Sequence, residues 1–131
     1  MAYLWVAIGG ALGSMARYGV SGLVSAMAGG VFPYGTLVVN VTGAMLIGFL
    51  ATLSGPESRF FIPTYGQLFL MTGICGGYTT FSTFSLETAN LMRDGEWGAA
   101  LANVGGSVLI CLVAIWVGHL GALALDRLRG A

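Results

Sequence analysis

Apolar residues dominate this chain in four long runs that are separated by short polar breaks. The runs cover Tyr3–Ala28, Tyr34–Leu53, Tyr65–Leu91 and Ala99–Leu125. A helix of about 20 apolar residues crosses a hydrocarbon core of about 30 Å, so each run is long enough to span a membrane. The pattern predicts an all-α membrane protein: one domain, residues 1–131, with four transmembrane helices.

Composition supports the membrane interpretation. Charged residues make up only 8% of the chain, against about a quarter in ordinary soluble domains. Five arginines balance five acids and lysine is absent, so no basic patch is available for nucleic acid. The first run lacks the basic segment of a cleavable signal peptide, and we expect it to be retained as a helix. Cys75 and Cys111 lie inside apolar runs, where we expect small buried residues rather than a disulfide or metal pair.

An even number of spans places both termini on the same side of the membrane. That side holds Arg59, Arg127 and Arg129, and the opposite side holds Arg93. Arginine-rich segments favour the cytoplasm, so the difference mildly favours cytoplasmic termini. A bias this small would allow insertion in both orientations.

Small residues recur at four-residue spacing on three of the predicted helices, a pattern that lets helix backbones approach closely. The pairs are Gly9 with Gly13, Ala44 with Gly48, and Ala102 with Gly106. They fit packing within one subunit or between subunits. Because four helices alone hardly enclose an ion path, we expect an oligomer.

The third run contains the strongest local signal, Gly73–Ser85, in which glycines are followed by β-branched hydroxyl residues. This is poor helix-forming material, and it predicts a break near Gly76–Thr79 at mid-membrane depth. Unwound backbone is tolerated there only when it is buried in protein or lines a watery cavity. The alternative is a glycine kink in which the threonines bond back to the helix.

Phenylalanines and hydroxyl residues follow this break together. Phe81 and Phe84 are three residues apart and share a helix face, and Ser82 and Thr83 supply hydroxyl donors beside them. Aromatic ring edges are electropositive. Ring edges and hydroxyls could hold a small dehydrated anion without a fixed charge that would trap it, so the segment favours a halide path over a cation path.

Two other helices contribute polar residues at helical spacing. Thr36 and Asn40 lie one turn apart in the second run, and Asn40 is either an interhelical hydrogen-bonding residue or part of a functional site. In the fourth run, Asn103, Ser107 and Cys111 form one stripe at four-residue spacing.

Three ionisable residues also lie inside the apolar runs. Arg17 is too deep to reach the interface and needs a partner or an aqueous vestibule. Glu87 is either that partner, in a structural ion pair, or faces a vestibule itself. His119 is single, and we expect a packing or interfacial role for it.

Taken together, these motifs resemble the CrcB/Fluc family of fluoride channels. The residues that carry the resemblance are Gly13–Tyr18 (GSMARY), Gly35–Asn40 (GTLVVN) and Gly73–Ser85, in that order and in a chain of matching length and span number. The last two strings together are highly specific.

The resemblance implies an antiparallel, dual-topology homodimer with two pores and a central structural sodium ion. The backbone carbonyls that bind sodium would be those of Gly76 and Thr79. The phenylalanines that face fluoride would be Phe81 and Phe84.

The same resemblance assigns a polar track. Asn40 and Thr36 would line it, Glu87 would lie at the polar end of the pore, and Ser107 would supply a hydroxyl. Two positions of this chain depart from the family pattern. Asn103 stands where the family usually has a tyrosine, and its amide can still donate hydrogen bonds. Cys111 stands where the family often has a serine, and its thiol is a poor donor.

The resemblance also implies the physiological role. Fluoride enters acidified cells as HF, dissociates, and is driven out across the inner cell membrane through a passive, selective channel that is not an enzyme. The main alternative is a proton-coupled exporter like the small multidrug resistance proteins, which needs a carboxylate in the first span, where this chain has Arg17. A non-transporting assembly subunit would leave Asn40 and the phenylalanine string without a role.

Overall fold

The computed structural model describes residues 1–130, which are entirely helical apart from short connections. The elements are α1 (Ala2–Ala28), α2 (Tyr34–Leu53), α3 (Thr64–Gln67), the π-helix η1 (Leu68–Cys75), α4 (Gly76–Tyr78), α5 (Phe81–Arg93) and α6 (Trp97–Arg129). The segments α3, η1 and α4 are continuous, and a gap of two residues separates them from α5. The chain therefore forms four long rods, of which the third is interrupted, as the sequence predicted.

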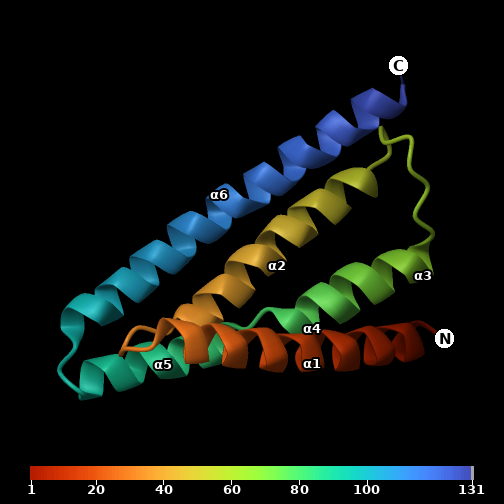
Figure 1. Ribbon diagram of the computed structural model, residues 1–131. Coiled ribbons are helices and arrows are strands. Elements are labelled where there is room, and N and C mark those ends of the chain that lie inside the picture. The colour runs from red at the N-terminus through yellow and green to blue at the C-terminus, as the bar shows by residue number, and fades with distance from the viewer. Residues whose placement is uncertain (131) are drawn as a thin grey trace.

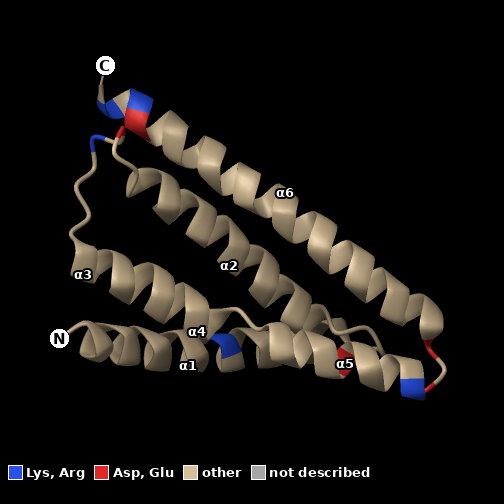
Figure 2. Ribbon diagram, turned by 180° about the vertical axis from the view of Figure 1, so that it is seen from behind, with Lys and Arg blue, Asp and Glu red and all other residues tan. Residues whose placement is uncertain are grey.

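The rods run back and forth between two ends of the molecule (Figure 1). The two termini and the connection 54–63 lie at one end, and the connections 29–33 and 94–96 lie at the other. Charged residues gather at these two ends, and only isolated ones lie between them (Figure 2). This distribution leaves the long middle zone to apolar side chains, as a bilayer requires.

Two helices, α2 and α6, are by length and composition long and apolar enough to cross a membrane. The observed bounds of α2 coincide with the predicted run. Helix α6 spans 33 residues and extends beyond the predicted Ala99–Leu125 at both ends. Its large apolar side chains are mostly exposed, which suits a surface that faces lipid or another subunit.

Glycines bring α1 against the first half of the third rod. A Cβ added at Gly13 would lie 2.9 Å from the backbone nitrogen of Tyr78, and one at Gly73 would lie 2.8 Å from Cα of Gly9. These glycines therefore act within one subunit, as does Gly48, whose added Cβ would lie 3.0 Å from Cα of Ile115 on α6.

The third small-residue pair behaves differently from the other two. Ala102 is exposed, and a Cβ at Gly106 would meet no atom within 4 Å. This pair therefore contributes nothing to packing within the described chain.

His119 makes a structural contact between α2 and α6. Its Nδ1 lies 2.8 Å from Oγ1 of Thr52, and its ring meets Trp116 edge to face, with centroids 5.5 Å apart. The geometry fits the packing role expected from the sequence.

Gly13→Ala is expected to destabilise the protein, because the new methyl group meets backbone of Ile74 and Tyr78 that cannot move aside independently. Overpacking of this kind costs about 1–3 kcal/mol. The matched control is Gly19→Ala on the same helix, where an added Cβ has no neighbour within 4 Å and helix propensity favours alanine. Thermal melting of the purified protein in detergent measures both, and equal melting temperatures for the two variants would contradict the packing argument.

Candidate functional site

The third rod is interrupted at Thr79 and Thr80. Thr79 has φ −78° and ψ 157°, and Thr80 has φ −150° and ψ 118°, so both are extended. The predicted break at Gly76–Thr79 was therefore too early, since Gly76–Tyr78 remain helical. The glycines of this segment serve close packing against α1, and the β-branched threonines, which suit extended backbone, make the break.

Asn40 on α2 holds the interrupted backbone. The Thr80 backbone N–H donates to Asn40 Oδ1 at 2.8 Å, and Asn40 Nδ2 donates to the Thr80 carbonyl at 3.0 Å. The side-chain amide thus replaces the helical partners that Thr80 has lost, which matters because unpaired backbone groups are costly inside a membrane. One N–H of the Asn40 amide has no partner among the described residues.

Thr80 also caps the helix that follows. Its Oγ1 accepts a hydrogen bond from the Thr83 backbone N–H at 3.1 Å and donates to Thr83 Oγ1 at 3.1 Å. A threonine at this position satisfies one of the free N–H groups at a helix start. The positive end of α5 consequently lies at the middle of the third rod. Thr80 was not among the predicted site residues, although a threonine directly before a helical run is an N-cap signal.

The interruption leaves backbone carbonyls free, among them those of Gly76 and Thr79. Within residues 1–130, no hydrogen bond ends on the carbonyl of Gly76 or of Thr79. The natural helical donor to the Gly76 carbonyl is the Thr80 N–H, which turns to Asn40 instead. Uncharged carbonyl oxygens at a helix break are the ligands that a hard monovalent cation takes, so this pair fits the predicted sodium site.

An apolar groove with a few polar groups lies beside the interruption. The rings of Phe81 and Phe84 form one wall, with centroids 5.4 Å apart and planes tilted by 44°. The groove has a volume of about 340 Å³ and is lined by Asn40, Ala44, Ile47, Thr79, Thr80, Phe81, Phe84, Ser107, Val108, Cys111 and Ile115. Phe84 is 9% exposed but Phe81 is 78% exposed, so the groove is open along the Phe81 edge in a single chain.

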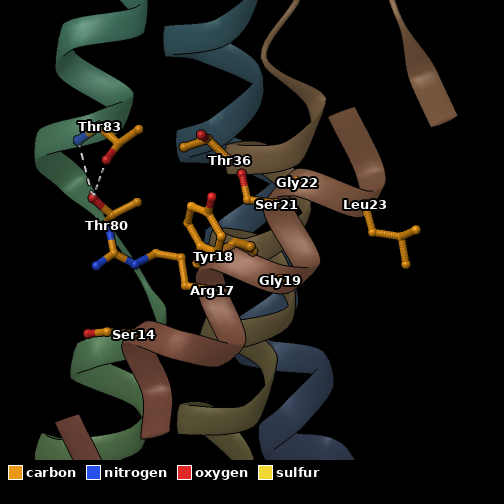
Figure 3. Close-up of a pocket in the computed structure, with 11 residues that line it drawn as sticks. Ser14, Arg17, Tyr18, Gly19, Ser21, Gly22, Leu23, Thr36, Thr80 and Thr83 are labelled. Carbon is orange, nitrogen blue, oxygen red and sulfur yellow. Dashed lines mark hydrogen bonds between the residues drawn. The ribbon is translucent and has the colours of Figure 1, made fainter. Parts of the chain in front are cut away.

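A larger cavity of about 760 Å³ lies on the other side of the interruption, between α1, α2 and α5. Arg17 reaches into it beside Ser14 and Thr80 (Figure 3). Thr36 and Thr83 also line this cavity. Thr83 and Ser82 were expected beside the phenylalanines, but neither lines the groove. Successive helical residues point in different directions, so Thr83 faces the larger cavity, the rings face the groove, and Ser82 is exposed and lines neither.

Glu87 is hydrogen-bonded to a residue of α2 and not to Arg17. Thr36 Oγ1 donates to Glu87 Oε1 at 2.8 Å. Glu87 Oε2 and Arg17 Nε are both buried and have no hydrogen-bond partner among the described residues, so the ion pair considered from the sequence is not formed. Glu87 lines a third cavity, of about 280 Å³, next to the connection 29–33 and Asp94.

The three residues of the polar stripe on α6 do not share one environment. Ser107 and Cys111 line the groove, whereas Asn103 is 1% exposed and lies in neither the groove nor the larger cavity. Asn103 instead donates to Thr88 of α5 at 2.9 Å and accepts from Ser107 at 3.2 Å. The sequence analysis did not identify Thr88, because an isolated threonine in a helical run gives no distinguishing signal.

The fold and site together define an all-helical membrane protein in which one helix is interrupted between two cavities, each with a mainly apolar lining and a few polar groups. This architecture is typical of ion channels and transporters. Residues 4–119 match the family model described as CrcB-like protein, Camphor Resistance (CrcB).

Curated relatives resemble the chain over its whole length. "Fluoride-specific ion channel FluC" of Opitutus terrae is 56% identical over 98% of each chain. Proteins of the same name from Methylocella silvestris and Rhodospirillum rubrum are 51% and 52% identical, over at least 97% of each chain. The chain belongs to the CrcB-like family, which confirms the resemblance inferred from its motifs.

Proposed function

We propose that this chain is a passive, selective fluoride channel of the inner cell membrane that releases cytoplasmic fluoride. The names of its full-length relatives support this assignment. The observation that carries it is the composition of the groove: two phenylalanine rings, amide and hydroxyl groups, and no charged side chain. A channel must hold its ion strongly enough to replace water and weakly enough to release it.

The groove residues meet both requirements. The ring edges of Phe81 and Phe84 carry partial positive charge. The free amide N–H of Asn40 adds a directional donor that replaces water around a small anion. Because none of these groups carries a full charge, the anion leaves as readily as it enters.

The larger cavity serves as the vestibule of this path. Arg17 supplies a positive charge that concentrates anions there. Thr80 lines both the vestibule and the groove, so the α5 N-terminus lies between the two. Thr36 and Glu87, joined at 2.8 Å, form the boundary between the vestibule and the third cavity, with Thr83 on the vestibule side.

The functional unit that we propose is an antiparallel homodimer of chains with four membrane spans each. The exposed Phe81 edge leaves the groove without an outer wall, and a second copy would supply one. The outward-facing Ala102 and Gly106 add a surface on which another helix can pack closely.

A structural sodium ion at the dimer axis belongs to the same proposal. The free carbonyls of Gly76 and Thr79 would hold it. When bound, it supplies positive charge that offsets unpaired carbonyl dipoles in a low-dielectric region. The side-chain hydroxyl of Thr79 donates to the Cys75 carbonyl at 2.9 Å.

Ion efflux from liposomes tests the proposed function. Purified protein is reconstituted into vesicles loaded with potassium fluoride or potassium chloride, and valinomycin is added under an outward potassium gradient. We expect rapid fluoride release, measured with a fluoride electrode, and retention of chloride. Protein-free vesicles provide the baseline, and chloride release as fast as fluoride release would exclude a selective fluoride channel.

A further inference from the structure

A chain of hydrogen bonds joins α5 to α6 behind the groove. Ser107 Oγ donates to Asn103 Oδ1 at 3.2 Å, Asn103 Nδ2 donates to Thr88 Oγ1 at 2.9 Å, and Thr88 Oγ1 donates to the Phe84 carbonyl at 2.7 Å. Every donor points the same way, from the groove toward α5. We call Thr88, Asn103 and Ser107 the relay.

The relay is buried. Thr88 is 6% exposed, Asn103 1% and Ser107 6%. Of the three, Ser107 alone lines the groove. Thr88 and Asn103 therefore make no contact with the groove, and they reach a passing ion only through Ser107.

The direction of the hydrogen bonds has a consequence for Ser107. A serine hydroxyl has one proton and two lone pairs. Its proton is given to Asn103, so the groove faces oxygen lone pairs, which repel an anion. Ser107 donates to fluoride only after Asn103 ceases to accept its proton.

We propose that Thr88 and Asn103 are positioning residues that switch the Ser107 proton between Asn103 and the groove, an inference that rests on the fluoride-channel function proposed above. Rotation of the Asn103 amide exchanges its oxygen and nitrogen. Thr88 then donates to Oδ1, Nδ2 donates to Ser107 Oγ, and the Ser107 proton is free for the anion. No covalent bond changes, and every proton stays on its own atom.

In both arrangements the Asn103 amide is hydrogen-bonded to Thr88 and to Ser107. The Thr88 hydroxyl can accept from or donate to the amide, and the Phe84 carbonyl keeps its place in the α5 backbone ladder in either case. Reversal frees the Ser107 proton, which the anion in the groove then accepts, so the hydroxyl is not left unpaired when fluoride is present. An apolar side chain at position 88 allows neither arrangement.

Thr88→Val tests the relay in the liposome efflux assay. Valine keeps the shape of threonine and removes only the hydroxyl, so Asn103 loses its partner in both orientations. We expect fluoride efflux to fall about tenfold, the effect of losing one buried hydrogen bond at the rate-limiting step. Thr88→Ser restores the hydroxyl and is expected to conduct within about twofold of the unmodified protein.

A double mutant separates the relay from general packing. If Thr88 acts through Asn103, efflux of Thr88→Val combined with Asn103→Leu equals that of Asn103→Leu alone. Ser54→Ala is the control, because Ser54 also donates to the carbonyl four residues earlier, at 2.7 Å, but lies just after the end of α2 and lines neither the groove nor the larger cavity. Its efflux is expected to match that of the unmodified protein.

The outcomes distinguish the relay from the channel itself. Three results would overturn the relay. They are efflux in Thr88→Val equal to that of the unmodified protein, a loss of efflux in Thr88→Ser as large as in Thr88→Val, and a double mutant whose loss is the sum of the two single losses. Absence of fluoride efflux from the unmodified protein would overturn the proposed function and the relay with it. Gel filtration in detergent shows whether each variant is assembled; if Thr88→Val is not, Thr88→Ala replaces it under the same criteria.

Discussion

Asn40→Leu is expected to abolish fluoride efflux and to lower the thermal stability of the purified protein. The Asn40 amide supplies both hydrogen bonds to the Thr80 backbone, at 2.8 and 3.0 Å. Leucine fills a similar volume but leaves a buried N–H and a buried C=O unpaired, at a cost of about 1–3 kcal/mol each. The Thr80 backbone would then become helical or form hydrogen bonds with other neighbours. Either change would alter the positions of the side chains that line the groove.

Asn90→Leu is the control for this variant. Asn90 is an exposed asparagine on α5 whose side chain makes no hydrogen bond among the described residues. We expect its melting temperature in detergent to stay near that of the unmodified protein. If Asn40→Leu melts at the same temperature as Asn90→Leu, the amide does not hold the interruption.

Phe81→Ile is expected to reduce fluoride efflux by at least about tenfold, which corresponds to roughly 1.4 kcal/mol on the barrier. Isoleucine is apolar but has no electropositive ring edge to face the anion. Because Phe81 is 78% exposed in the single chain, the substitution removes few contacts within the subunit. Loss of efflux with unchanged melting would therefore reflect the ion path rather than the fold.

Phe84→Ile is expected to reduce efflux similarly and to lower stability as well, because Phe84 is 9% exposed and packs within the chain. The control is Phe61→Ile, which removes a 91% exposed ring in the connection 54–63, remote from the groove. Efflux assays and melting curves are compared across the three variants. Equal efflux in Phe81→Ile and Phe61→Ile would remove the ring edges from the mechanism.

The sequence predicted the helices well because membrane insertion imposes a simple rule. Long apolar runs must become helices that satisfy their own backbone, so Tyr34–Leu53 could be delimited to the residue. It did not predict the π-helix η1, and it placed the interruption at Gly76–Thr79, whereas the extended residues are Thr79 and Thr80. The exact position involves contacts between elements, such as the hydrogen bonds from Asn40 of α2 to the Thr80 backbone, which the pattern along one helix does not encode.

The candidate site was identified as a set of residues but not as an arrangement. The sequence placed Thr83 beside Phe84, whereas the two line different cavities. It treated Asn103 as a pore residue, whereas the structure places it behind Ser107. Spacing along a helix fixes the direction of each side chain relative to its neighbours, but the rotation of that helix against the others fixes which cavity each one meets.

By itself, the sequence determined that this chain is a helical membrane protein and a member of a known family. Hydrophobicity, motif order and the scarcity of charge are properties of residue identity, and no packing is needed to read them. The tertiary structure alone decided that Asn40 supports the backbone of Thr80, that Arg17 and Glu87 stay apart, and that Thr88 belongs with Ser107. Those relations join residues 19 to 70 positions apart, and only the packing of helices brings them together or holds them apart.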